Sequence, residues 1–288
     1  MTVASESIDD VLEYILPRIR SHKERDSRSA FVIGLTGLQG SGKSTWAAAL
    51  HNALETKHHQ MVVSLSLDDL YHSHDKLIHI QEENPDNALL QSRGQPGTHD
   101  VELASEFFSS LDSRNGVLIP SFDKSLFNGQ GDRRPREHWK HVPPDPPIDI
   151  VIFEGWCVGF LSLGDEPLRK KWQEAQLQDT IQSQKAWSIQ TLGSIKLEHL
   201  CKINSNLRVY NETFLRPDRF HSLIHLDTEN LANVYSWRLE QEHALWRIKG
   251  EGMTDNDVVQ FVKGYMPSYE LYLDQLRHRS VIKVEIVC

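Results

Sequence analysis

The stretch "FVIGLTGLQGSGKST", residues 31–45, joins a short apolar run to a glycine-rich loop that ends in Lys43. The apolar run 31–37 ends in glycine and is typical of a strand buried on both faces of a parallel sheet. Residues 43–56 include three consecutive alanines and predict a helix. The loop between them matches the pattern G-x-x-x-x-G-K-[ST] at Gly37, Gly42, Lys43 and Ser44. This order of strand, loop and helix is the context in which the pattern binds phosphate.

In such a loop, successive backbone N–H groups point inward and form a nest for an anion. The following helix presents its positive end to the same place. We expect Lys43 to reach the β and γ phosphates of ATP and the Ser44 hydroxyl to ligate Mg²⁺. By average residue usage, the pattern arises by chance in roughly one chain in a hundred of this length, so an accidental turn is the weaker alternative. The segment expected to bind the nucleotide comprises Gly37, Leu38, Gln39, Gly40, Ser41, Gly42, Lys43, Ser44 and Thr45.

Strands and helices alternate along the rest of the chain. Further strands are predicted at 61–69, 117–119, 148–154, 222–227 and 281–287, and further helices at 6–20, 100–111, 230–248, 254–263 and 268–277. This alternation predicts an α/β fold, a three-layer α/β/α sandwich of the P-loop NTPase type with a mainly parallel sheet. We expect one domain over 1–288, with an N-terminal helix and linker at 1–30. Two segments interrupt the pattern, a proline-rich and glycine-containing loop excursion at 120–147 and a polar, helical insertion at 164–195.

Charge and composition exclude several classes of partner. The net charge of −9 argues against nucleic acid or an anionic membrane as the main partner, because both attract basic surfaces. No apolar run approaches about 20 residues, so nothing in the sequence predicts a membrane span. The three cysteines, Cys157, Cys201 and Cys288, suit a reducing compartment better than a disulfide framework. We therefore expect a protein of the cytoplasm, or of the nucleus, that acts on a small molecule; its oligomeric state stays open.

Carboxylates follow two of the predicted strands. Asp68 and Asp69 close the stretch "SLSLDD", and Glu154 closes "IDIVIFE". In an open parallel sheet the ends of such strands line the ligand crevice. An acid there can accept a proton from an attacking hydroxyl or hold Mg²⁺, although a surface turn is the alternative for Asp69. We expect Asp68 to be the base, and Ser44, Asp68 and Glu154 to surround the metal.

At these residues the chain resembles a known superfamily. "GLQGSGKS", "SLDDLY", "RGQPGTHD" (93–100), "SFDKS" (121–125) and "FEGW" together are similar to the phosphoribulokinase, uridine kinase and pantothenate kinase superfamily. Longer strings, "FDKSLFNGQGDR", "VYSWRLEQE" and "GMTDNDVVQFVKGYMPSY", resemble D-glycerate 3-kinase and the fungal ATP-dependent kinase-like proteins related to it. The resemblance covers roughly residues 30–287 and is weakest across 164–200.

The resemblance implies roles for particular residues. Asp68 falls on the superfamily's proton-accepting aspartate and Glu154 on its magnesium-linked acid, with Lys43 as the third catalytic group. Arg238 falls where related kinases place an arginine near the nucleotide or a lid. The residues expected at the acceptor site are Asp69, Tyr71, Arg93, His99, Asp100, Asp123, Lys124 and Trp156.

An anionic acceptor needs a cation for its carboxylate, and the candidates are Arg93, Lys124 and Arg133. His99 could bind an acceptor hydroxyl or cap the helix predicted at 100–111. The basic run 132–136 could be a lid or an ordinary loop.

The first hypothesis is a kinase that transfers the γ-phosphoryl group of Mg-ATP to a hydroxyl, with D-glycerate or a similar small hydroxy acid as the leading acceptor. The alternative is an ATP-binding regulatory or scaffold protein without efficient catalysis, for which the insertion 164–195 would form a partner surface. A GTPase is the weaker third reading, because the chain lacks a convincing N-K-x-D string for guanine.

Overall fold

Strand β1 (Phe31–Gly37) lies in the middle of a five-stranded parallel sheet in the computed structural model of the chain. The structure describes residues 5–26, 28–113, 116–178, 187–250, 252–279 and 282–285. The strand order is β2–β7–β1–β8–β9, with β2 (Val62–Ser66), β7 (Ile150–Glu154), β8 (Ser222–Asp227) and β9 (Ile282–Glu285). β1 and β7 are buried along their whole length, which explains why both read as continuous apolar runs.

All the strand pairs in this sheet are parallel, so their carboxyl ends meet at one edge. Leu35 of β1 and Ser66 of β2 both lie opposite Glu154, the last residue of β7. Gly37, the last residue of β1, lies opposite Leu226 of β8. The start of the phosphate loop, the end of β2 and Glu154 therefore share the edge at which open sheets bind ligands.

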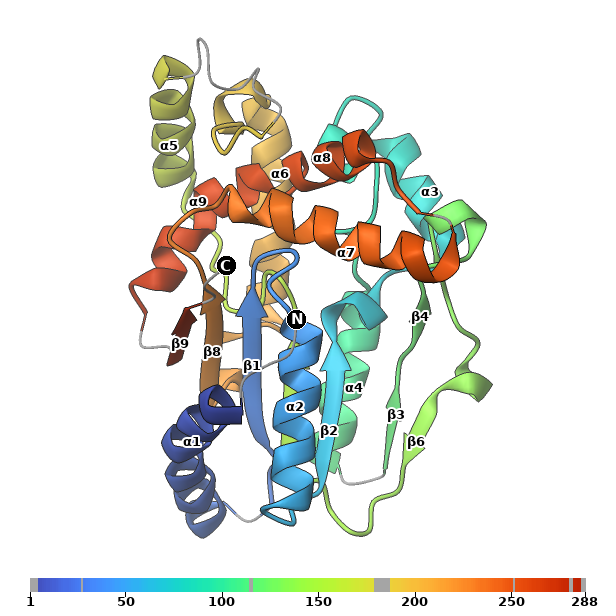
Figure 1. Cartoon of the computed structure of the whole chain (residues 1–288), viewed down its shortest axis with the longest axis vertical. Coiled ribbons are helices and arrows are strands. Elements are labelled where there is room, and N and C mark those ends of the chain that lie inside the picture. The colour runs from blue at the N-terminus through green and yellow to red at the C-terminus, as the bar shows by residue number, and fades with distance from the viewer. Residues whose placement is uncertain are drawn as a thin grey trace.

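Helices cover both faces of the sheet (Figure 1). α1 (Ser5–Arg25) and α2 (Lys43–Thr56) pack on one face around a core that includes Ile33 and Ile152. α4 (Val101–Ser113), α6 (Leu197–Glu212) and α9 (Met266–Arg277) belong to a second core around Phe153. The predicted three-layer α/β/α sandwich with a mainly parallel sheet is confirmed.

The remaining helices are α3 (His74–Glu83), α5 (Asp165–Gln178), α7 (Asn233–Lys249) and α8 (Asp255–Lys263). The sequence prediction missed α3 and α6. For α6 a signal was present, because its buried residues Leu200, Ile203 and Leu207 recur at helical spacing. Of the helices in the described part of the chain, none is long and apolar enough to cross a membrane.

The excursion 120–147 departs from the parallel pattern. The strand predicted at 117–119 is present as β3 (Val117–Ile119), but it pairs antiparallel with β6 (Lys140–Val142), outside the main sheet. β4 (Phe122–Asp123) and β5 (Asp132–Arg133) form a second antiparallel ladder. An antiparallel pair needs no helical crossover, and the chain between β3 and β6 folds back through the β4–β5 ladder. The strand 117–119 was expected in the parallel sheet, and that expectation was wrong.

Two other boundaries differ from the prediction. The strand expected at 61–69 ends at Ser66, because the Ser66 hydroxyl accepts a hydrogen bond from the N–H of Asp68 and starts a 3-10 turn over Leu67–Leu70. The insertion 164–195 is helical in α5, but Leu192–Ser194 forms only a short 3-10 turn. Residues 179–186 of that insertion lie outside the described part of the chain.

A buried histidine on β8 makes stability depend on pH. His225 is fully buried and neither ring nitrogen has a hydrogen-bond partner. Burial lowers the pKa of His225 to about 4, although the charge of Asp227 opposes this shift. A histidine in the unfolded chain binds a proton near pH 6.5. The stability of the fold with a neutral, buried His225 is therefore fully present above that pH and is lost as the pH falls toward 4, because the unfolded chain gains a proton that the folded chain does not.

We expect the free energy of unfolding to fall by about 1.4 kcal/mol per pH unit in this window for the one proton of His225. Urea unfolding of wild type and His225→Leu at pH 7, 6 and 5 measures the effect. In the variant, the free energy of unfolding should fall less steeply with pH, by the equivalent of nearly one proton, because leucine does not titrate. Equal slopes in the two proteins would contradict the assignment.

Candidate active site

The phosphate loop connects β1 to α2 and takes a shape that needs glycine. Gly40 and Gly42 have positive φ values of 82° and 84°. A Cβ atom on Gly40 would lie 2.7 Å from Cβ of Trp237, and one on Gly37 would lie 2.7 Å from Oγ of Ser41. Gly42 precedes α2, and no side chain caps that helix. The N–H groups at the start of α2 are therefore available to an anion.

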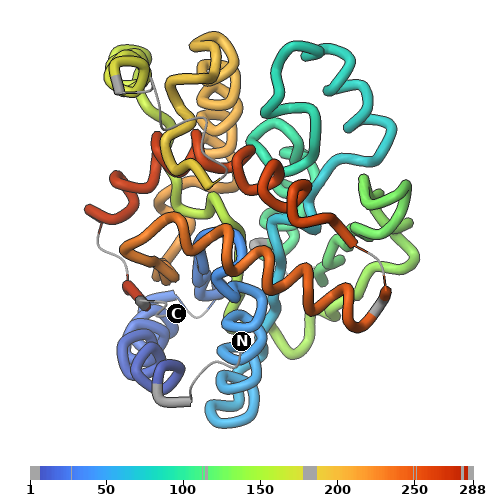
Figure 2. Tube along the Cα trace, turned by 45° about the horizontal axis from the view of Figure 1, so that its top comes forward, coloured from blue at the N-terminus to red at the C-terminus, as the bar shows by residue number. Residues whose placement is uncertain are grey.

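Helices α7 and α9 hold the loop in place. The N–H of Gln39 donates to the hydroxyl of Tyr269 at 3.0 Å, and Nε2 of Gln241 donates to the carbonyl of Gly40 at 3.4 Å. Figure 2 shows α7 crossing the N-terminal end of α2, beside the loop. Nζ of Lys43 donates to the carbonyl of Leu38 at 2.9 Å. Elements from the C-terminal third of the chain thus fix the position of the N-terminal phosphate loop.

Lys43, Ser44 and Glu154 lie together at the carboxyl edge of the sheet. Oγ of Ser44 donates to Oε1 of Glu154 at 3.0 Å. Burial lowers the pKa of Lys43, while the charges of Glu154 and Asp68 oppose that shift. The two carboxylates carry more negative charge than one ammonium neutralises, so a phosphate tail bound here needs a divalent cation such as Mg²⁺ beside Lys43.

The oxygen atoms at this edge suit Mg²⁺. In the described part of the chain, no group of three or more histidine, cysteine or acidic side chains could hold a metal by itself. Mg²⁺ in phosphoryl-transfer sites is commonly held by one or two carboxylates together with substrate phosphates. The neighbouring Ser44 hydroxyl and Glu154 carboxylate fit that mode of binding, and Asp68, like Glu154, lies near the ammonium of Lys43.

Asp68 lies in the 3-10 turn after β2, where two other side chains contact it. Its Oδ1 accepts from the hydroxyl of Tyr71 at 3.0 Å, and its Oδ2 accepts from Nζ of Lys124 at 2.5 Å. Burial works to raise the pKa of Asp68, but the charge and hydrogen bond of Lys124 outweigh it, so the pKa lies below its ordinary value. The carboxylate is therefore ionised and partly exposed, as a proton acceptor must be.

Asp69 has a different environment from its neighbour. Its Oδ1 accepts from the N–H of Phe122, which ties the start of β4 to the turn after β2. Burial raises the pKa of Asp69 to about 6. Its carboxyl group anchors the excursion to the turn after β2.

The loop 93–100 forms another wall beside Asp68. Nη1 of Arg93 donates to the carbonyls of Gly129 and Gln130, both at 2.5 Å. Asp100 accepts from the N–H of Leu103 and from Nη2 of Arg133, so Asp100 rather than His99 caps α4.

His99 is buried, and its ring stacks on Tyr71 with 4.4 Å between centroids. The hydroxyl of Tyr210 accepts from the N–H groups of Gly97 and His99, so its own proton goes to Nδ1 of His99 at 3.0 Å. Burial lowers the pKa of His99 to about 3, so the ring is neutral and carries its proton on Nε2.

Three residues expected at the site have contacts that explain their positions without a ligand. Trp156 is buried against Tyr265 and Tyr269, and its Nε1 donates to the carbonyl of Gly94, so it supports the loop 93–100 from below. Asp123 accepts from Ser125 and Arg134 and thereby shapes the turn before Lys124. Arg238 pairs with Glu242 at 2.8 Å, and its backbone nitrogen lies close to Gly40 of the phosphate loop.

The basic run 132–136 is tied to acidic side chains. Arg133 pairs with Asp100, Arg134 with Asp123 and Arg136 with Glu106. Because each of these guanidinium groups has an acidic partner, the run resembles an anchored loop more than a free basic lid.

Sequence reasoning missed the tyrosines of the string "GYMPSYELY". Gly94 has a φ of 142°, and a Cβ atom on it would lie 2.2 Å from the hydroxyl of Tyr265. Gln95 donates to the carbonyl of Gly264 and accepts from Ser268, so the loop 93–100 docks onto the start of α9. The sequence offered one signal, because Tyr265 and Tyr269 are four residues apart and therefore lie on the same face of a helix. Tyr265 packs against the loop 93–100, and Tyr269 binds the phosphate loop.

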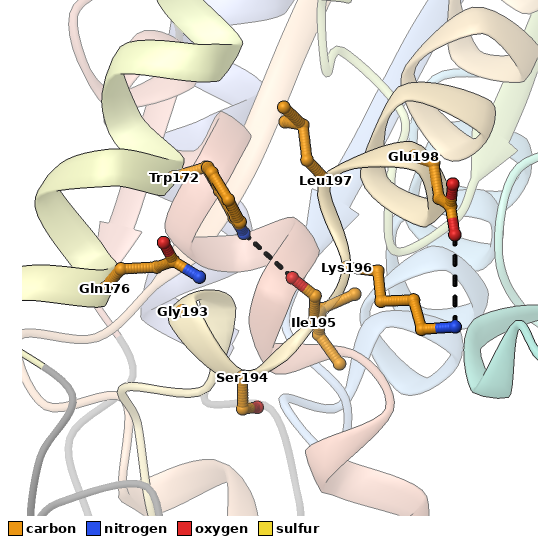
Figure 3. A pocket seen from close by; sticks show the side chains of 8 residues that line it. All are labelled: Trp172, Gln176, Gly193, Ser194, Ile195, Lys196, Leu197 and Glu198. Atoms are coloured by element: carbon orange, nitrogen blue, oxygen red, sulfur yellow. Dashed lines mark hydrogen bonds and ion pairs between the residues drawn. The ribbon is translucent and has the colours of Figure 1, made fainter.

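A separate open depression of about 380 Å³ lies between α5, the turn Leu192–Ser194 and the start of α6 (Figure 3). Nε1 of Trp172 donates to the carbonyl of Ile195 across it. None of its lining residues belongs to the phosphate loop or to the acidic strand ends. It is therefore distinct from the candidate active site.

A phosphate loop, a half-buried lysine and two acids at the carboxyl edge of a parallel sheet define a P-loop nucleotide-binding protein. No protein-family model matches the chain. The sequence is 36% identical over 275 residues to the uncharacterized kinase mug58 of Schizosaccharomyces pombe, covering 95% of this chain and 91% of that protein. It is 34% identical over 284 residues to the probable ATP-dependent kinase TDA10 of Saccharomyces cerevisiae, covering 95% and 89%.

Among solved structures, D-glycerate 3-kinase from Cryptococcus neoformans matches with a TM-score of 0.86 and 31% identity, covering 98% of this chain and 96% of that chain. The chain belongs to this family of fungal ATP-dependent kinases related to D-glycerate 3-kinase. It is therefore an ATP-using phosphotransferase with a hydroxyl group as acceptor.

Proposed function

We propose that this kinase phosphorylates a small hydroxy acid, with D-glycerate as the first candidate. The observation that carries the proposal is the position of Asp68, which lies beside Lys43 and Glu154 and is faced by the side chain of Lys124. A base and a cation next to the phosphate loop suit an acceptor with one hydroxyl to attack and one carboxylate to bind. The similarity to the solved structure of D-glycerate 3-kinase from Cryptococcus neoformans supports this choice.

In the proposed reaction, the acceptor oxygen attacks the γ-phosphorus and its proton passes to Asp68. The bond between the γ-phosphorus and the bridging oxygen breaks, and ADP leaves with that oxygen. Lys43 and the N–H groups at the start of α2 stabilise the negative charge on the phosphoryl group during transfer. Ser44 and Glu154 would hold Mg²⁺, which neutralises phosphate charge when bound. Tyr71 orients the carboxylate of Asp68.

A coupled assay of ADP release tests the proposal. Purified protein with Mg-ATP is offered D-glycerate, L-glycerate, other small hydroxy acids, pantothenate and uridine. We expect ADP release to require a hydroxy acid, and NMR of the product identifies the phosphorylated oxygen. ATP hydrolysis that does not depend on the acceptor, or a preference for a nucleoside, would count against a hydroxy acid as substrate.

The cytoplasmic or nuclear location stays a prediction from the sequence.

A further inference from the structure

Lys124 occupies the tip of a turn that two acids hold over the active site. Asp69 binds the N–H of Phe122 at the start of β4, and Asp123 accepts from the N–H and hydroxyl of Ser125 on the other side of the tip. The turn thus has its own anchors and does not depend on the contact between Lys124 and Asp68. The side chains of Lys124 and Asp68 are 56% and 32% exposed, so solvent and ligands reach their contact.

The other two candidate cations have partners that fix them. Arg133 donates to the carboxylate of Asp100 at 2.8 Å and to the carbonyl of Tyr71 at 2.7 Å. Arg93 donates to two backbone carbonyls of the excursion, which cannot move away without unfolding the turn. Lys124 differs, because its ion pair with Asp68 is more exposed than the pair of Arg133 with Asp100, and an exposed ion pair contributes little to stability.

The contact between the ammonium of Lys124 and the carboxylate of Asp68 affects how well Asp68 can act as the proposed base. The carboxylate already accepts from Tyr71 on one oxygen and from Lys124 on the other. The ammonium stabilises the ionised carboxylate and thereby weakens Oδ2 as an acceptor of the proton from the hydroxyl. A second carboxylate close to Nζ of Lys124 would satisfy the ammonium and release the oxygen of Asp68.

We propose that Lys124 selects an anionic acceptor, and that the carboxylate of the acceptor replaces Asp68 as the partner of its ammonium. The inference rests on the proposed function, because it requires a hydroxy acid as the substrate. An uncharged alcohol has no group to draw Lys124 from Asp68, so the base stays paired and transfer is slow. Lys124 is thus a specificity-determining residue, and Asp69 and Asp123 position it.

The test compares D-glycerate with D-glyceramide, its uncharged amide, as acceptors at saturating Mg-ATP. The proteins are wild type, Lys124→Met, Lys124→Arg and Lys140→Met. Lys140 is exposed on β6 of the same excursion and gives a matched control. We expect Lys124→Met to raise KM for glycerate about 10- to 100-fold, the range for loss of a hydrogen bond to a charged group, without lowering kcat/KM for glyceramide. Lys124→Arg should restore most of the preference, and Lys140→Met should match wild type.

Two results would overturn the inference. An equal loss with both acceptors would assign Lys124 to the phosphoryl group or to folding, and an unchanged KM for glycerate would remove it from the acceptor site. Both leave the proposed function standing, because wild type still phosphorylates glycerate. A wild type that phosphorylates no hydroxy acid would instead overturn the proposed function and this inference together.

Calorimetry gives a second measurement that needs no turnover. The ratio of the Kd for glyceramide to the Kd for glycerate reports how strongly the protein prefers the charge. Asp68→Asn should increase this ratio, because the carboxylate that competes for Lys124 is gone, and adding Lys124→Met to it should bring the ratio close to one. A ratio in Asp68→Asn no larger than in wild type would contradict the exchange of partners.

Discussion

An Asp68→Asn variant should bind Mg-ATP much as wild type does and transfer the γ-phosphoryl group about 10²- to 10⁴-fold more slowly, the usual contribution of a general base. Asparagine keeps the size of the side chain and can still accept from Tyr71, but it cannot take up the proton of the acceptor. Nucleotide binding should persist because no hydrogen bond joins Asp68 to the phosphate loop in the described part of the chain. Single-turnover kinetics measure the transfer step, and a fluorescent ATP analogue measures binding.

Asp75→Asn gives the matched control. Asp75 is an exposed residue in the first turn of α3, a few residues from Asp68, and its variant should keep wild-type turnover. Excess Mg²⁺ separates the two roles expected for Asp68. If the loss disappears at high Mg²⁺ concentration, the carboxylate serves the metal rather than the proton, and wild-type turnover in Asp68→Asn would remove it from both roles.

Lys43→Met should lose phosphoryl transfer by about 10²- to 10³-fold, as when one preorganised donor to the transition state is removed. Nucleotide affinity should fall as well, because Lys43 is expected to contact the phosphates in both the ground state and the transition state. The free energy of unfolding should not fall, because burial already disfavours the charged form of Lys43. Steady-state kinetics, nucleotide titration and urea unfolding measure the three quantities.

Lys57→Met is the matched control, because it also removes a positive charge from α2 but at the C-terminal end of the helix. Lys57 is exposed, pairs with Asp9 and lies at the end of α2 remote from the phosphate loop, so its loss should leave turnover unchanged. Turnover in Lys43→Met within a factor of about three of wild type would contradict the phosphate-binding role, because a charge at the γ-phosphoryl group cannot contribute so little.

Local signals in the sequence predicted much of the sheet and the phosphate loop. Three elements have the predicted bounds: Phe31–Gly37, Lys43–Thr56 and Ser222–Asp227. Their ends could be predicted because a buried strand ends where its apolar run ends, and the short glycine-rich loop marks the start of the helix. Glu154 was expected at the carboxyl edge because it ends an apolar run, and the sheet places it there beside Ser44. These inferences needed only the order of residues and the geometry of parallel sheets.

The walls of the acceptor site could not be predicted in this way. Lys124 lies 56 residues from Asp68 in the sequence, and the hydroxyl of Tyr269 lies 230 residues from the N–H of Gln39. The spacing of residues predicts their neighbours on one element, whereas contacts across loops depend on how β4, β5 and α9 pack. For the same reason the sequence did not show that Trp156 packs in the core or that Arg238 pairs with Glu242.

The sequence by itself determined the phosphate loop, the parallel sheet behind it and the acids at the strand ends, because each depends on a short run of neighbouring residues. Only the tertiary structure decided which cation reaches Asp68, which helix supports the loop and which aromatic residues lie beneath the acceptor site. The physical reason is that side-chain packing and ion pairing act between segments brought together by folding, and no local pattern records which segments those will be.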